Sequence, residues 1–148
     1  MTKIWLRPDF CFLRGLFMLP LLVTAALIEH DGKVLLTRRK KEGAHPLLWE
    51  FPGGKLEASE DPKVCVVREI REELGIDIAI ERLFEVVYYR YPERPVLIIA
   101  YCCSWISGEV VNLDVAEHRW VTPEEVRNFD LLPADAPLAD KLCAERAK

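Results

Sequence analysis

Short apolar runs recur along this chain, and residues typical of turns separate most of them. Residues 21–29 and 33–38 are apolar and partly β-branched, and Asp31-Gly32 between them strongly favours a hairpin. Residues 96–106 form a longer apolar run, which suits a strand buried on both faces of a sheet. The same pattern predicts further strands at residues 76–83, 84–90 and 117–121. Strands therefore dominate the expected fold.

The signals for a helix are strongest between residues 62 and 74. Asp61 is a natural N-cap, Pro62 occupies a position where a first helical residue tolerates proline, and Gly75 is the expected stop. At about 100° per residue, one side of this helix collects the apolar residues that we expect to pack on a core. These residues are Val64, Val67, Ile70 and Leu74.

Two further helices are predicted near the C-terminus. The segment Thr122-Pro123-Glu124-Glu125 is a capping box and starts a helix that ends near Asn128. Residues 137–147 are expected to form a final helix with Leu138, Leu142 and Cys143 inward. With many strands and two or three helices, the expected fold is α/β (α+β), with a mixed sheet between helices.

The helix at residues 62–74 also carries an acidic side. Glu69, Glu72 and Glu73 fall within an arc of about 100°, where like charges at helical spacing destabilise. Clusters of carboxylate oxygens suit hard divalent cations, above all Mg²⁺, which shares its ligands with substrate phosphates. The alternative is a solvated acidic face with Arg68 and Arg71 as its partners.

The wider spacing favours the metal site. Gly54 is followed after five residues by Glu60, and after seven more by Arg68-Glu69-Ile70-X-Glu72-Glu73-X-Gly75-Ile76. This spacing matches every fixed position of the Nudix box, so the chain resembles a Nudix hydrolase. The resemblance implies an α/β/α sandwich and the cleavage, by water, of a nucleoside diphosphate linked to another group.

The resemblance also implies roles for individual residues. Mg²⁺, with Mn²⁺ as a substitute, is expected to bind Glu69, Glu72, Glu73 and the carbonyl of Gly53. Glu69 is the expected residue that orients or deprotonates the water. Lys55 pairs with a phosphate or is simply solvated. Four other positions of the motif are expected to be structural: Gly54, Glu60, Arg68 and Gly75. Of these, Glu60 and Arg68 are expected to brace the loop and the helix.

The similarity extends beyond the box, from about residue 22 to residue 142, to the MutT branch and the related CTP pyrophosphohydrolases. Thr37-Arg38-Arg39, the segment Leu48-Trp49-Glu50-Phe51-Pro52-Gly53-Gly54-Lys55 and Leu132-Pro133-Ala134-Asp135-Ala136-Pro137 have counterparts there. By this resemblance Arg39 and Phe51 help to hold the nucleotide. For Phe51, core packing is the alternative.

Two positions depart from the MutT pattern. Asp135 stands where MutT has an Asn that reads oxidised guanine, and Asp occupies this place in the CTP-directed relatives. A carboxylate can accept from the exocyclic amine of cytosine, and it can also donate if burial raises its pKa. The alternative for Asp135 is a cap on the last helix. The family's distal metal ligand, a Glu, is replaced by Asp114, with Glu117 as the other candidate.

These features predict a Mg²⁺-dependent nucleoside triphosphate pyrophosphohydrolase that releases a nucleoside monophosphate and pyrophosphate. The expected substrates are cytidine nucleotides or oxidised or modified (d)NTPs, in nucleotide-pool sanitation. One alternative is a Nudix hydrolase of ADP-ribose or dinucleoside polyphosphates. Another is a non-catalytic nucleotide-binding Nudix module, but such modules tend to lose box glutamates that this chain keeps.

Length, charge and cysteine content indicate the number of domains, the partners and the compartment of the protein. The chain has 148 residues, enough for one domain, and a net charge of −4 gives no broad basic surface for nucleic acid. The five cysteines are odd in number and form no C-x-x-C pair, which is typical of reduced thiols in a cytoplasm. We expect a monomer or a homodimer without membrane or nucleic-acid partners.

The N-terminus resembles a signal peptide, because the uncharged residues 15–28 follow three basic residues. The run is short for a membrane span, which needs about 20 residues. Cleavage near Ala25 would also remove much of a predicted strand. We therefore expect residues 1–20 to be an extension that need not belong to the fold, with Met18 as an alternative start, and residues 21–148 to form the Nudix domain.

Overall fold

The computed structural model describes residues 19–148, and the predictions for residues 1–18 lie outside them. Seven strands form one mixed sheet with the order β3-β2-β1-β6-β5, while β4 pairs with β1 and β7 with β2. The strands are β1 (Leu21–His30), β2 (Lys33–Arg38), β3 (Trp49–Glu50), β4 (Gly53–Lys55), β5 (Asp77–Arg90), β6 (Pro95–Ser107) and β7 (Glu117–Val121). The predicted fold class is confirmed.

The predicted hairpin is present between β1 and β2. Asp31 and Gly32 both have positive φ angles, 49° and 73°, as a two-residue turn of this kind requires. The register pairs His30 with Lys33 and Glu29 with Val34.

Strand β6 is an interior strand of the sheet, parallel to β1 and antiparallel to the edge strand β5. Its side chains alternate between two apolar clusters, one on each face of the sheet. Ile98 and Ala100 belong to one cluster, and Tyr101 and Cys103 to the other. The prediction of a strand buried on both faces is therefore confirmed.

The prediction of two strands at residues 76–83 and 84–90 is wrong. These residues form one long strand, β5, whose pairing with β6 shifts register at Ile80/Arg82 and at Leu83/Glu85. An extra residue in one strand interrupts the alternation of apolar and polar side chains without ending the strand. The interruption imitates a strand boundary in the sequence.

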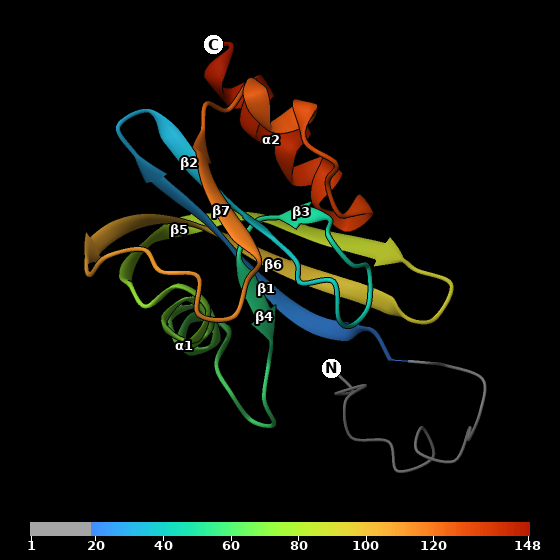
Figure 1. The fold of residues 1–148 in the computed structure, drawn as a ribbon. Coiled ribbons are helices and arrows are strands. Elements are labelled where there is room, and N and C mark those ends of the chain that lie inside the picture. Colours follow the sequence, from blue (N-terminus) through green and yellow to red (C-terminus); the bar gives the residue numbers. More distant parts are fainter. Residues whose placement is uncertain (1–18) are drawn as a thin grey trace, which may run out of the picture.

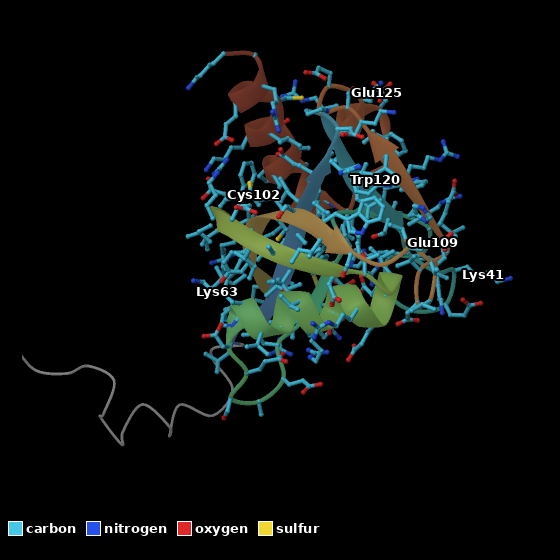
Figure 2. All side chains as sticks on the ribbon, turned by 90° about the vertical axis from the view of Figure 1, so that its left-hand side faces the viewer. Lys41, Lys63, Cys102, Glu109, Trp120 and Glu125 are labelled. Atoms are coloured by element: carbon cyan, nitrogen blue, oxygen red, sulfur yellow. The ribbon has the colours of Figure 1, made fainter. Side chains whose placement is uncertain are left out.

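Helices cover both faces of the sheet (Figure 1), with α1 (Pro62–Leu74) on one face and α2 (Ala136–Arg146) on the other. In the view turned by 90° (Figure 2), α1 and α2 again lie on opposite sides of the strands, and Lys63 marks the first turn of α1. No helix in residues 19–148 has the length and apolar character needed to cross a membrane.

The predicted ends of α1 are confirmed, and its predicted apolar side is partly wrong. Asp61 accepts a hydrogen bond from the Lys63 amide at 2.7 Å, and Gly75 ends the helix with φ 69°. The buried residues are Cys65, Val66, Ile70 and Leu74. Val64 is 59% exposed because the buried face of α1 is centred near Ile70, and at about 100° per residue Val64 lies about 120° away from Ile70.

The helix predicted after Thr122 is present as a short 3₁₀ helix, Glu125–Asn128, which ends at the predicted residue. Half of the box is present, because the Glu125 side chain accepts from the Thr122 amide at 2.8 Å. A second 3₁₀ turn, Pro133–Asp135, leads into α2. The helix α2 begins within one residue of the predicted position, and it buries Leu138 and Leu142 while Cys143 is only partly buried.

Candidate active site

One large cavity, about 750 Å³, is lined by residues of β1, β4, α1 and the 3₁₀ turn before α2. It brings together eight of the residues that the sequence predicts for the site. They are Arg39, Phe51, Gly53, Gly54, Lys55, Glu69, Glu73 and Asp135. The cavity lining does not include Glu72, Asp114 or Glu117.

The diglycine turn lies pressed between β1 and α1. A Cβ atom on Gly53 would lie 2.0 Å from the backbone oxygen of Thr24. A Cβ atom on Gly54 would lie 2.2 Å from the carboxyl carbon of Glu69. Gly53 has no room for a side chain against the backbone of β1, and a side chain on Gly54 would displace the Glu69 carboxylate, so the glycines allow β4 to pair with β1 while Glu69 contacts the turn.

Arg68 connects the helix to the loop before it. Its guanidinium binds both oxygens of Glu60, with Nε–Oε2 at 2.7 Å and Nη2–Oε1 at 2.9 Å. It also binds Glu69 at 3.0 Å and Glu72 at 3.1 Å, and donates to the Lys55 carbonyl at 3.3 Å. This arginine lowers the pKa of Glu60 to about 2. A planar fork that binds a carboxylate through two nitrogens is suited to bracing.

Glu73 is the least satisfied carboxylate of the helix. Burial, followed by the charges of Glu50 and Glu69, raises its pKa to about 9, and the Gly53 amide opposes the shift. Its Oε2 atom is buried and has no hydrogen-bond partner. Burial also raises the pKa of Glu69, against the influence of Arg68.

A hard cation fits this pair of carboxylates. Glu73 offers an unpartnered buried oxygen, and Glu69 lines the same cavity. In residues 19–148 no group of three His, Cys, Asp or Glu side chains is arranged to hold a metal ion. Glu69 also pairs with Arg68, so an ion bound here would share the Glu69 carboxylate with that arginine. Any further ligands would come from backbone, water or substrate oxygens, as is usual for Mg²⁺.

The remaining acidic candidates are directed elsewhere. The side chain of Glu72 is 56% exposed and pairs with Arg68. Asp114 lies beside the end of α1, where its amide donates to the Glu73 carbonyl, but its carboxylate pairs with Lys40 at 2.9 Å. Glu117 is bound to Arg119. The structure therefore brings Glu69 and Glu73 together and leaves these three outside the cavity.

Asp135 is buried in the cavity wall and does not cap α2. It stands at the N-cap position, yet its side chain makes no capping hydrogen bond. Its Oδ2 atom instead accepts from the Phe51 amide at 2.8 Å. Burial, with Glu50 nearby, raises the pKa of Asp135 well above its usual range. Phe51 itself is 3% exposed and belongs to the core, while it also lines the cavity.

Arg39 is held in place at the cavity by two contacts. Its Nη1 pairs with Glu50 at 3.0 Å, and its Nε donates to the Ala44 carbonyl at 3.0 Å. Burial raises the pKa of Glu50, and Arg39 opposes that shift. The arginine is therefore pre-positioned, with its charge partly balanced by Glu50.

Sequence reasoning missed three residues that line the cavity: Glu50, His45 and Tyr91. The rings of His45 and Tyr91 lie 4.6 Å apart, and the Tyr91 hydroxyl accepts from the Ala134 amide at 3.0 Å. Tyr91 lies in a segment with turn-forming residues, so the sequence alone indicates a turn there and not a residue of the cavity lining. Glu50 had a signal, since it belongs to the Leu-Trp-Glu-Phe segment shared with the MutT branch.

Replacing Arg68 with lysine tests the brace. Arg68→Lys keeps one positive charge but cannot bind Glu60 through two nitrogens while holding Glu69 and the Lys55 carbonyl. We expect a lower melting temperature and a kcat reduced about tenfold, because the loop and Glu69 lose their common anchor. Arg71→Lys is the matched control, since Arg71 pairs with Asp77 outside the cavity. Equal effects of the two substitutions would contradict the brace.

Comparisons with known proteins show the family of the chain. The chain is 38% identical over 128 residues to the CTP pyrophosphohydrolase of Escherichia coli K12, covering 84% of this chain and 93% of that protein. It is 30% identical over 126 residues to the 8-oxo-dGTP diphosphatase of the same organism, covering 84% and 98%. The crystal structure of a MutT protein from Methanosarcina mazei Go1 superposes with a TM-score of 0.79 at 26% identity, covering 90% of this chain and all of that one. The NUDIX domain family matches residues 18–142, so the chain belongs to this family and is a Nudix hydrolase.

Proposed function

We propose that this chain is a Mg²⁺-dependent nucleoside triphosphate pyrophosphohydrolase that releases a nucleoside monophosphate and pyrophosphate. Its substrates are cytidine nucleotides or oxidised or otherwise modified (d)NTPs, and its role is to cleanse the nucleotide pool. The observation that carries the proposal is a single cavity lined both by box carboxylates and by the buried Asp135.

The polyphosphate is held by the part of the cavity that contains the box residues. Nudix hydrolases generally use divalent metal ions, and Glu69, Glu73 and the Gly53 carbonyl would hold Mg²⁺ here. The bound ion would neutralise charge on the phosphates and lower the pKa of a water molecule. Glu69 orients that water or takes its proton. Lys55, which has an exposed side chain beside the cavity, pairs with a phosphate.

Asp135 reads the base in this proposal. One of its oxygens is already occupied by the Phe51 amide, so the other is available to a ligand in the cavity. Because the pKa of Asp135 is raised, its carboxyl group is able to donate as well as accept. Cytosine presents an exocyclic amine that donates and a ring nitrogen that accepts, which complements a protonated carboxyl. The 38% identity to a CTP pyrophosphohydrolase supports this assignment.

Arg39 and Phe51 complete the nucleotide site. The guanidinium of Arg39 is held near the cavity by Glu50 and can meet the negative charge of the nucleotide. The ring of Phe51 supplies an apolar wall, and its amide orients Asp135. Phe51 therefore combines core packing with a place in the site.

A substrate panel tests the proposal. The initial rates of hydrolysis of CTP, dCTP, 5-methyl-dCTP, 8-oxo-dGTP, ADP-ribose and diadenosine tetraphosphate are compared with Mg²⁺ and with EDTA. We expect kcat/KM to be highest for a cytidine or modified nucleoside triphosphate, with pyrophosphate as product and no turnover in EDTA. ADP-ribose or the dinucleotide as the best substrate would contradict the assignment. Binding of nucleotide without any product would indicate a non-catalytic module.

A further inference from the structure

A buried polar pair, Thr24 of β1 and Cys65 of α1, lies against the diglycine turn. The two residues are 1% and 0% exposed, and Thr24 Oγ1 lies 3.5 Å from Cys65 Sγ. In residues 19–148 the other buried polar or charged residues are Thr37 and Asp135, and the other buried cysteines are Cys102 and Cys103. Burying a hydroxyl group costs free energy unless the group has hydrogen-bond partners, so partners are expected at such a position.

The partners of this pair are two carbonyl groups of the turn. The Thr24 hydroxyl donates to the Gly54 carbonyl at 3.3 Å. The Cys65 thiol lies 3.5 Å from the Lys55 carbonyl oxygen and 3.7 Å from that of Gly54. Arg68 donates to the same Lys55 carbonyl at 3.3 Å. Side chains from β1 and α1 therefore hold the two carbonyls together.

The position of the turn determines where the Glu69 carboxylate can lie. A Cβ on Gly54 would come within 2.2 to 2.7 Å of the carboxyl carbon and both oxygens of Glu69. With so little space between them, a small shift of Gly54 changes the space open to the carboxylate. Misplacement of a catalytic group by about 1 Å can lower a rate about 100-fold.

We propose that Thr24 and Cys65 are positioning residues that fix the diglycine turn and, through it, the Glu69 carboxylate. This inference rests on the proposed function, because it assigns the pair to the geometry that a divalent cation and a polyphosphate require. Thr24 and Cys65 act through the position of the turn and do not contact the base of the nucleotide in this proposal. Its loss therefore lowers ion affinity and kcat and leaves the KM for nucleotide nearly unchanged.

The test uses two deletions of a polar group and two conservative replacements. Thr24→Val and Cys65→Ala remove the hydrogen-bonding group, whereas Thr24→Ser and Cys65→Ser retain a donor. Cys103→Ala is the control, because Cys103 is a buried thiol that contacts the Tyr101 carbonyl away from the turn. For each full-length variant, Mn²⁺ binding to the nucleotide-free protein is measured by electron paramagnetic resonance, and kcat and KM are measured with the best nucleotide.

We expect Thr24→Val and Cys65→Ala each to lower kcat about tenfold and to weaken Mn²⁺ binding, with KM changed less than about twofold. The serine variants should stay close to the wild type, and so should Cys103→Ala. Because the two residues share partners, the double variant should lose less than the product of the single losses.

Wild-type Mn²⁺ affinity and kcat in Thr24→Val and Cys65→Ala would overturn the proposal, as would an equal loss in Cys103→Ala. If Thr24→Val does not fold, comparison of Cys65→Ala with Cys65→Ser tests the proposal in the same way. A wild-type protein that binds Mn²⁺ but hydrolyses no nucleotide would refute the proposed function alone. The Mn²⁺ affinities of the variants would then still decide the role of the pair.

Discussion

Glu73→Gln is expected to abolish most of the hydrolysis while making the metal-free protein more stable. If Glu73 binds the ion as proposed, the loss of its carboxylate should lower kcat about 10³-fold. The gain in stability has a separate cause, which is the burial of Glu73 with an unpartnered oxygen. A glutamine of nearly the same shape carries no charge that burial can penalise.

The size of this effect depends on pH. The pKa of Glu73 is raised in the folded state from 4.5 to about 9, so its stabilising contribution is complete below about pH 4.5 and is lost as the pH rises through 9. The stability of the wild type should fall relative to Glu73→Gln by at most about 1.4 kcal/mol per pH unit in this range.

Chemical denaturation in EDTA at several pH values from 5 to about 8.5 measures the difference in the free energy of unfolding. The exposed Glu57→Gln is the control, and its difference from the wild type should not grow with pH. A Glu73→Gln protein that is less stable than the wild type across this range would show that the carboxylate has a structural role instead. Unchanged kcat in this variant would remove Glu73 from the proposed ion site.

Asp135→Asn is expected to change the choice of base more than the overall rate. An amide can accept from the Phe51 amide just as Asp135 does, so the wall of the cavity should survive. The NH2 group of the new side chain then faces the base in place of the second carboxyl oxygen, and it forms different hydrogen bonds with the base. We expect the ratio of kcat/KM for CTP to that for 8-oxo-dGTP to fall about 100-fold, since a buried hydrogen-bonding group discriminates strongly against a mismatched ligand.

Steady-state kinetics with both nucleotides, at saturating Mg²⁺, measure this ratio. Asp130→Asn is the matched control, because Asp130 is an exposed aspartate in the preceding loop. Asp135→Ala should lower discrimination further and also destabilise, because the Phe51 amide is left buried without a partner. If the ratio stays the same in both Asp135 variants, Asp135 does not read the base.

The parts of the fold that follow local rules could be predicted from the sequence. Asp61, Pro62 and Gly75 set the limits of α1 through short-range hydrogen bonds and backbone preferences. Asp31 and Gly32 set the hairpin through their positive φ angles. Such signals depend only on neighbouring residues, so the sequence displays them directly.

Errors arose where tertiary packing decides. The register shifts in β5 break the alternation of side chains, although pairing with β6 keeps the strand continuous. Val64 is exposed because the buried face of α1 is centred near Ile70, and Val64 lies about 120° around the helix from that residue. Tertiary packing decides which side of α1 faces the sheet, and the four predicted apolar residues did not define that side.

The site was predictable only in part for the same reason. The spacing in the box places Glu69 and Glu73 on one side of α1, but it does not show that Glu72 is exposed. The cap alternative for Asp135 was excluded only by the missing capping hydrogen bond and by the bond to Phe51, 84 residues away. Asp114 and Glu117 were proposed from alignment alone, and their pairing with Lys40 and Arg119 leaves both outside the cavity.

The central claim is that Glu69 and Glu73, set against the diglycine turn, bind the ion that holds a nucleotide in the cavity. The most direct measurement is a crystal structure with Mg²⁺ and a non-hydrolysable CTP analogue. We expect the ion on the carboxylates of Glu69 and Glu73 and the base within hydrogen-bonding distance of Asp135. An ion bound away from both glutamates, or a nucleotide bound outside this cavity, would contradict the account.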